Sequence, residues 1–133
     1  MIKTSKEKIK SILNHFDIKQ DSYVILHTSL FVLGQIEGGI KTIYDLIIKK
    51  YATEGTVIVP TFTYSPMKKE VYDYKITKSS VGQFSEQFRL LPFTKRTLHP
   101  IFSVAYTGAL ERKIANTSLN TCFGKDSVFQ LLL

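Results

Sequence analysis

Thr56–Pro60, with the sequence TVIVP, is the stretch that decides the fold of this chain. It is an uninterrupted apolar run that follows a turn-forming Glu-Gly pair, and such a run is typical of a strand buried on both faces of a sheet. Two other runs have the same character, at Tyr23–His27 and Ile101–Ala105. We therefore predict that strands at about 23–27, 56–60 and 101–106 share one sheet.

The segments between these runs have the period of amphipathic helices. A capping-box pattern at Thr4–Glu7 begins the first helix, and the second helix covers residues 40–51. The third is capped by one of the serines at 79 and 80 and stops at Pro92. The alternating order predicts an α/β fold, a layered sheet with helices packed on its faces.

Length and composition predict one globular domain over residues 1–133. Apolar residues make up 44% of the chain and charged residues 22%, which is close to the average for folded proteins. No apolar run is long enough to cross a bilayer and no signal peptide is recognisable, so we expect a cytoplasmic protein without a membrane partner. Val128–Leu133 begins an apolar element that stops, and we therefore expect the domain to be truncated at its C-terminus.

The chain is basic, with 18 lysines and arginines against 11 acidic residues and a net charge of +7. An ordinary solvated surface and a polyanionic small ligand both account for this excess. The lysines are spread along the chain without a dense basic run, so we expect no nucleic-acid partner.

Three segments that contain hydroxyl side chains, two of them also glycine, are expected to follow the strands. They are His27–Leu30 together with 34–39, Pro60–Tyr64, and Cys122–Ser127. Ligands of open α/β sheets gather at the carboxyl ends of the strands, and backbone N–H groups in such loops favour anions. This chemistry suits a pyrophosphate or a thioester carbonyl, although each segment alone is also compatible with an ordinary turn.

Six short motifs follow one another in order along the chain. They are His-Thr-Ser-Leu at 27–30, Glu-Gly-Gly at 37–39, Glu-Gly-Thr with Val-Pro-Thr-Phe-Thr at 54–63, Ser-Ser-Val-Gly at 79–82, Leu-His-Pro with Ser-Val-Ala at 98–105, and Cys-Phe-Gly-Lys-Asp-Ser at 122–127. In this order the motifs resemble the aminoglycoside 3-N-acetyltransferase family. The resemblance covers about Ser5 to Leu133, which is the first half of the family's usual length.

The resemblance implies transfer of an acetyl group from acetyl-CoA to an amine of an aminoglycoside or other amino sugar, an activity connected with antibiotic resistance. It implies no covalent enzyme intermediate and no metal. His99 would be the general base, since an imidazole titrates near neutral pH, where an alkylamine is mostly protonated.

The resemblance also assigns binding residues. Acetyl-CoA would contact Thr28, Ser29, Phe123, Gly124 and Ser127. Glu37 would bind the substrate amine or, equally, cap the helix that starts at Ile40. Cys122 is expected to be a small buried residue rather than a nucleophile, because no base can be placed beside it from the sequence.

The acceptor is constrained by charge. Between Pro60 and His99, seven basic side chains stand against three acidic ones, a poor match for a polycationic drug. An amino sugar of lower positive charge, such as one linked to a nucleotide, fits this surface better. Two other functions stay open: that of a non-catalytic module that binds CoA or another phosphate ligand, and that of a basic nucleic-acid-associated domain.

Overall fold

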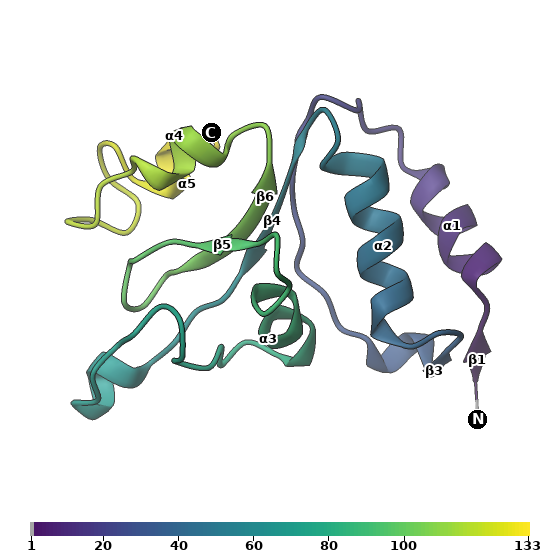
Figure 1. Ribbon diagram of the computed structural model, residues 1–133, viewed down its shortest axis with the longest axis horizontal. Helices are drawn as coiled ribbons and strands as arrows, with labels where there is room; N and C mark the ends of the chain where they lie inside the picture. Colours follow the sequence, from purple (N-terminus) through teal and green to yellow (C-terminus); the bar gives the residue numbers. More distant parts are fainter. Residues whose placement is uncertain (1) are drawn as a thin grey trace.

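A four-stranded mixed sheet forms the centre of the molecule (Figure 1). The computed structural model describes residues 2–133. The strands lie in the order β2 (Tyr23–Ile25), β4 (Thr56–Pro60), β6 (Val104–Gly108) and β5 (Lys95–Arg96). β2 and β4 are parallel, whereas β6 is antiparallel to both β4 and β5. The prediction that the three apolar runs share one sheet is therefore confirmed.

The antiparallel direction of β6 decides where its preceding loop lies. Pro60, at the carboxyl end of β4, is paired with Val104, the first residue of β6. The 97–103 loop thus lies at the same end of the sheet as the loops that follow β2 and β4. The third strand begins at Val104 instead of Ile101, because the N–H groups of Ile101 and Phe102 bind the side chain of His99.

Three helices lie on one side of the sheet. α2 (Ile40–Tyr51) and α3 (Gln83–Arg89) pack on the strands, and α1 (Lys6–His15) packs against α2 (Figure 1). Their apolar faces enclose a core with the sheet that consists of Ile9, Ile43, Tyr44, Ile47, Tyr51, Val57, Val59, Phe84, Phe88 and Ala105. Since side chains alternate along a strand, Ile58 points to the opposite face.

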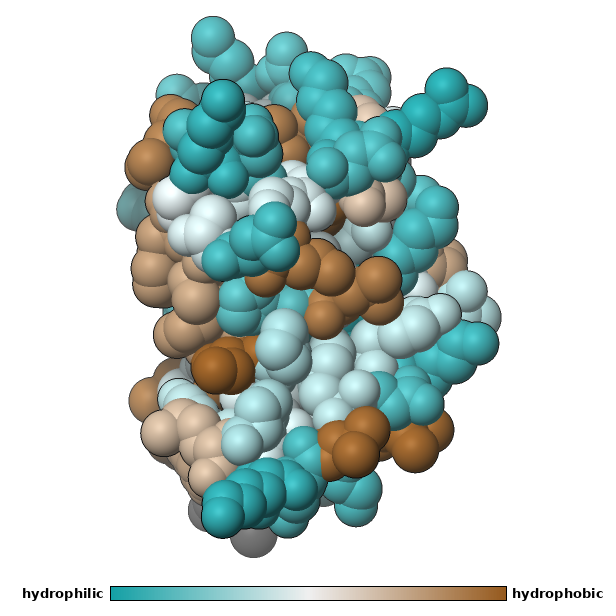
Figure 2. Space-filling model, turned by 90° about the vertical axis from the view of Figure 1, so that its left-hand side faces the viewer, coloured by the Kyte–Doolittle hydropathy of each residue, from teal (hydrophilic) through white to brown (hydrophobic). Residues whose placement is uncertain are grey.

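The opposite face is covered by two short helices, α4 (Glu111–Ala115) and α5 (Val128–Leu131). Its core is smaller and consists of Ile58, Val104, Tyr106, Ile114 and Val128. Viewed from the left of Figure 1, exposed apolar residues form several separate groups among polar ones (Figure 2). Helices on both faces confirm the layered α/β prediction. Within residues 2–133, no helix has the length and apolar character of a membrane span.

Two helix starts differ from the predictions. Ser5, rather than Thr4, is the N-cap of α1, and its hydroxyl accepts a hydrogen bond from the N–H of Lys8. The N-cap of α3 is Gly82 rather than a serine, because the N–H of Ser79 donates to the Glu86 carboxylate and keeps that segment outside the helix.

Three short strands and two 3-10 helices had no recognisable pattern. β1 (Lys3–Thr4) pairs in parallel with β3 (Gln35–Ile36) in a separate two-stranded sheet. The 3-10 helix η1 (Phe31–Leu33) lies just before β3, and η2 (Ser65–Lys68) lies within the long loop after β4. Two-residue strands such as β1, β3 and β5 are too short to show a period of two.

Candidate functional site

His99 is held by backbone hydrogen bonds in the loop between β5 and β6. Its Nδ1 accepts from the N–H of Ile101 at 3.2 Å and from the N–H of Phe102 at 3.0 Å. Its Nε2 lies 3.4 Å from Sγ of Cys122. The ring is half-buried beside the Phe102 ring, with 5.9 Å between the ring centres. The imidazole therefore fixes the shape of this turn.

These hydrogen bonds determine which His99 nitrogen carries the proton. Because Nδ1 accepts two N–H groups, the neutral ring has its proton on Nε2. Burial lowers the pKa of His99, which keeps the ring neutral at neutral pH. A general base needs an unprotonated nitrogen that faces the substrate, whereas here the lone pair faces the backbone. The geometry favours a positioning role, and the general-base role stays a prediction.

Cys122 differs from the prediction in two ways. It is half-buried rather than buried, and a histidine does lie beside it although the two are far apart in sequence. A thiolate–imidazolium pair would need a proton on Nδ1 of His99, where two N–H donors already point. His99 therefore does not activate the thiol in this arrangement.

Four phenylalanines connect the predicted site segments. The ring of Phe102 lies 5.1 Å from Phe62 and 5.2 Å from Phe123, measured between ring centres. Phe129 of α5 lies 5.1 Å from Phe123. Phe123 remains 61% exposed, so part of its ring is open to a ligand. The 122–127 segment follows α4 rather than a strand, yet these contacts bring it to the carboxyl ends of β2 and β4.

Thr28 lines a small cavity at this same end of the sheet. The cavity has a volume of about 150 Å³, and Pro60 and Phe62 form part of its wall. Thr28 and the adjacent Ser29 are both exposed in the loop that follows β2. Phe62 therefore lies between the Thr28 cavity and the aromatic cluster around Phe123. The structure brings the two predicted cofactor segments to one region.

Gly124 and Ser127 shape the turn before α5. The N–H of Gly124 donates to the Thr121 hydroxyl at 2.9 Å, and a Cβ at Gly124 would meet that hydroxyl at 2.7 Å. Ser127 is fully buried, and its hydroxyl accepts from the N–H of Gln130 as the N-cap of α5. Ser127 thus has a capping function, and its contact with a cofactor stays a prediction.

Glu37 lies apart from the other predicted residues. Its carboxylate accepts a hydrogen bond from the N–H of Lys6, the first residue of α1, at 3.0 Å. The interpretation that it caps the helix at Ile40 is wrong, since the N-cap of α2 is Gly39 without a side-chain hydrogen bond. Glu37 follows β3 beside α1 and α2, whereas the His99 loop lies on the other side of the molecule (Figure 1).

The buried residue that the sequence did not reveal is Arg96. It is 8% exposed, and its guanidinium donates to the carbonyls of Thr61, Tyr74 and Thr77. It also donates to the Thr61 and Ser103 hydroxyls and lies 5.3 Å from the Tyr72 ring centre. Arg96 fastens the long loop after β4 to the sheet. The sequence shows an arginine three residues before His99, but a charged side chain is expected to be exposed, so its burial was not predicted.

Metal ligands do not gather anywhere in the part of the chain that the structure describes. No group of three His, Cys, Asp or Glu side chains within residues 2–133 has the arrangement of a metal site. The groups that the structure does bring to the His99 end of the sheet are hydroxyls, backbone N–H groups and aromatic rings.

Comparison with known sequences shows the family to which this chain belongs. A model of the aminoglycoside 3-N-acetyltransferase family matches residues 25–133, which include all of the sheet except part of β2. The chain belongs to this family. It is 27% identical over 134 residues to the SPbeta prophage-derived aminoglycoside N(3')-acetyltransferase-like protein YokD of Bacillus subtilis strain 168. That alignment covers 84% of this chain and 49% of YokD.

Solved structures have the same fold. The crystal structure of YokD from Bacillus subtilis gives a TM-score of 0.79 at 26% identity, over 92% of this chain and 58% of that one. AAC-IIIb in a binary complex with CoASH gives 0.79 at 19% identity, over 97% and 56%. AAC(3)-Xa gives 0.80 at 20% identity, over 97% and 53%. This chain thus spans about half the length of the family members it matches.

Proposed function

We propose that this chain forms the acetyl-CoA-binding part of an N-acetyltransferase that acts on an amine of an amino sugar. The observation that carries the proposal is the convergence of the Thr28 loop, the Phe62 ring and the Phe123 turn at one end of the sheet. Membership of the family supports it. So does the likeness in fold to AAC-IIIb, which was solved with CoASH.

The cofactor would lie along the exposed part of this region. The hydroxyls of Thr28 and Ser29 would donate hydrogen bonds to the pantetheine amides or to the thioester carbonyl, where they would stabilise developing negative charge. The open surface of Phe123 would pack against the apolar pantetheine arm. Gly124 and the capping Ser127 would hold the Phe123 turn in place.

The transfer step itself is simple. The amine nitrogen attacks the thioester carbonyl carbon, a C–N bond forms, the C–S bond breaks, and CoA leaves as a thiolate. The amine also loses a proton, which ends on the thiolate or in solvent. His99 is the predicted base for that proton. To accept it at Nε2, the neutral ring would have to carry its own proton on Nδ1, and the hydrogen bonds from the N–H groups of Ile101 and Phe102 would have to break. As a positioning residue, it would instead keep the 99–102 turn in the shape that the cofactor meets.

The acceptor class is proposed from relatives and from charge. AAC-VIa was solved with sisomicin, and a histidine variant of AAC(3)-IVa was solved with a gentamicin. This chain shares the fold of these proteins. We assign it an amino-sugar acceptor, and the basic loop between Pro60 and His99 favours one of lower positive charge than these drugs.

Release of CoA thiol tests the proposed function. The purified chain is incubated with acetyl-CoA and either gentamicin or glucosamine, free thiol is followed with a disulfide dye, and the acetylated product is identified by mass spectrometry. Thiol release that depends on the amine supports the transferase. CoA binding without amine-dependent release supports the second candidate, a non-catalytic CoA-binding module, which the two N–H donors on Nδ1 of His99 favour. Absence of both results would reject the proposal.

A further inference from the structure

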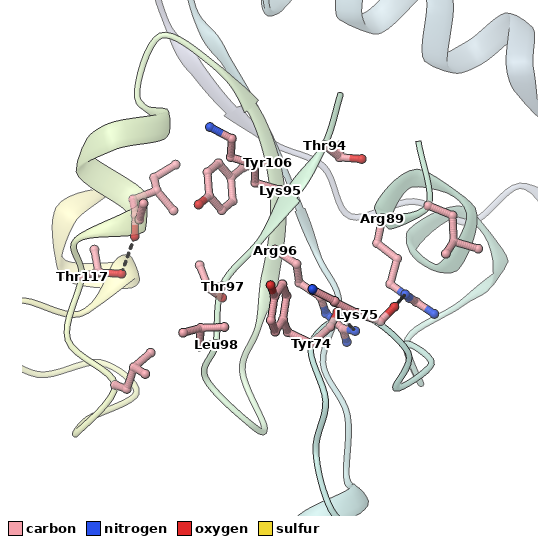
Figure 3. Close-up of a pocket in the computed structure, with 14 residues that line it drawn as sticks. Tyr74, Lys75, Arg89, Thr94, Lys95, Arg96, Thr97, Leu98, Tyr106 and Thr117 are labelled. Carbon is pink, nitrogen blue, oxygen red and sulfur yellow. Dashed lines mark hydrogen bonds between the residues drawn. The ribbon is translucent and has the colours of Figure 1, made fainter. Parts of the chain in front are cut away.

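The outer edge of β5 is open and lies in a groove (Figure 3). β5 is the last strand in the order of the sheet and pairs only with β6. A cleft of about 600 Å³ runs along it, and every residue from 94 to 98 lines this cleft. We call this cleft the β5 groove. The end of the sheet is therefore accessible along the whole of its last strand.

The walls of the β5 groove come from both layers of helices. The end of α3, at residues 89–90, lines one side, and the end of α4, at residues 114–115, lines the other. Figure 3 shows Arg89 and Thr117 on opposite sides of β5. The side chains of Lys95 and Arg96 point to opposite faces, since their partners in β6 belong to the two different cores. The groove thus surrounds the edge of the sheet, as the place of a further strand would.

Arg96 turns the polar groups of its backbone toward this groove. The N–H of the next residue, Thr97, donates to the carbonyl of Val104 at 3.0 Å, so these two residues form a hydrogen-bonded pair of the antiparallel ladder. Such pairs alternate with pairs that exchange no hydrogen bonds, and the N–H and C=O of Arg96 therefore point away from β6. Neither group has a hydrogen-bond partner within residues 2–133. An additional strand would pair with both.

The side chains around the β5 groove combine apolar surface with positive charge. Leu90, Leu98 and Leu119 line it and are 60%, 50% and 44% exposed. No acidic residue lines the groove, and Lys75, which does line it, forms no ion pair with any Asp or Glu of the described chain. The occupant that matches this lining is an extended segment with apolar side chains and a carboxylate.

A second copy of this chain does not match the lining. Pairing of two β5 strands would bring together two grooves that each have basic and no acidic lining residues. Like charges that face one another across a pair of strands are destabilising. The net charge of +7 on each copy adds to this repulsion.

The family members contain a different source of a strand. The YokD and AAC(3)-Xa structures share the fold of this chain over 92% and 97% of its length, which is 58% and 53% of theirs. The remaining part of each of these proteins is close to half of the fold. A walled sheet edge with free backbone groups is a surface on which such a part can add a strand.

We propose that the β5 groove receives a strand from the part of the family fold that lies outside the match. The strand pairs with the N–H and C=O of Arg96, its apolar side chains contact the three leucines, and an acidic side chain lies near Lys75. The sheet thereby gains a fifth strand. Because the His99 loop follows β5 directly, the added strand also fixes one end of that loop.

Binding of peptides to the purified chain tests this inference. The probes are overlapping peptides of about 12 residues, longer than a typical strand, that together cover the half of YokD outside the match. Fluorescence anisotropy should show saturable binding of at least one peptide that has apolar and acidic side chains. Hydrogen exchange of the Arg96 amide, followed by NMR, should slow by about tenfold or more in that complex, because its N–H becomes paired.

Three variants show where the peptide binds. Leu119→Glu should weaken binding by about tenfold or more, and Lys75→Glu should weaken binding of the acidic peptide by about threefold or more. Ile12→Glu, a matched change at an exposed position of α1, should leave binding unchanged. The melting temperatures of the Leu119 and Lys75 variants should stay near that of the unmodified chain, because both side chains are exposed.

Failure of every peptide to bind would overturn the inference. Binding that leaves the exchange of the Arg96 amide unchanged, or that both groove variants retain in full, would overturn it as well. Sedimentation of the chain alone tests the other occupant: self-association that Leu119→Glu abolishes would assign the groove to a second copy instead.

Discussion

The two faces of the central sheet are packed to very different degrees. Ten buried hydrophobic residues form the core under α1, α2 and α3, whereas five form the core under α4 and α5. β2 shows the difference within one strand, since Val24 packs into the first core while Tyr23 and Ile25, which point the other way, are exposed. Tyr106 and the partly buried Phe129 belong to the smaller core. The face under α1, α2 and α3 therefore has the larger core, and the aromatic cluster of the candidate site lies on the face with the smaller core.

Substitution of one core residue on each face should show the largest difference. Phe88→Ala should lower the free energy of unfolding by about 3–5 kcal/mol, a large share of the roughly 5–15 kcal/mol typical of a domain. Val128→Ala removes two methyl groups from the smaller core and should cost about 1–2 kcal/mol. Urea denaturation followed by circular dichroism measures both. Equal losses would show that the two faces contribute alike.

Substitution of Arg96 should have the next-largest effect on stability, because this residue joins the long loop after β4 to the sheet. An ammonium cannot reach the three carbonyls that the guanidinium binds, so Arg96→Lys should cost about 2–3 kcal/mol. Proteolysis within residues 61–78 should also become faster. Arg112→Lys, at an exposed position of α4, is the control. If the Arg96→Lys variant is as stable as this control, Arg96 does not hold the loop against the sheet.

The role of His99 is tested by comparing the variants His99→Asn and His99→Leu. Asparagine places an acceptor near Nδ1 and should keep stability within about 0.5 kcal/mol, whereas leucine leaves two N–H groups unpaired and should cost about 1–2 kcal/mol. If His99 only positions the turn, acetyl transfer survives in the asparagine variant. If it is the general base, transfer falls about 10²- to 10⁴-fold in both variants although His99→Asn remains folded.

The smallest expected effect is the pH dependence of stability. Burial lowers the pKa of His99 in the folded chain below its ordinary value of about 6.5. Below that pH the unfolded chain binds more protons, so this contribution to stability is complete above about pH 6.5 and is lost as pH falls through the folded pKa. Urea midpoints measured downward from about pH 7.5 should fall less steeply for His99→Asn. If the urea midpoints of the two proteins fall equally with pH, the titration of His99 is not the cause of the pH dependence.

The fold was predictable where apolar patterns are long. The run at 56–60 and the helix at 40–51 have enough residues to show their character, and they lie where the sequence predicts. The strand predicted at 23–27 is shorter and ends at Ile25. The start of β6 was misplaced, because His99 captures two N–H groups that would otherwise join the ladder. The two-residue strands were missed because pairing over such lengths depends on tertiary contacts.

The sequence predicted which segments lie near one another better than it predicted their contacts, and the functional site itself stays a prediction. The motifs predicted that the segments of Thr28, His99 and Phe123 gather at one end of the sheet. The aromatic cluster connects the last two, and Thr28 lines a cavity with Phe62 of that cluster. Nothing in the sequence showed that Cys122 would face His99, or that Arg96 would be buried without a carboxylate. Both depend on how the 97–103 loop returns to the sheet, which is a property of long-range packing.

Titration of the chain with CoA tests the central claim, that the Thr28–Phe123 end of the sheet is a cofactor site. Isothermal calorimetry should show saturable binding of one CoA per chain. Thr28→Arg and Phe123→Asp, both at exposed positions, should weaken binding by about tenfold or more without lowering the melting temperature, and Lys10→Glu should leave it unchanged. Absence of saturable binding, or binding that both site variants retain in full, would contradict the claim.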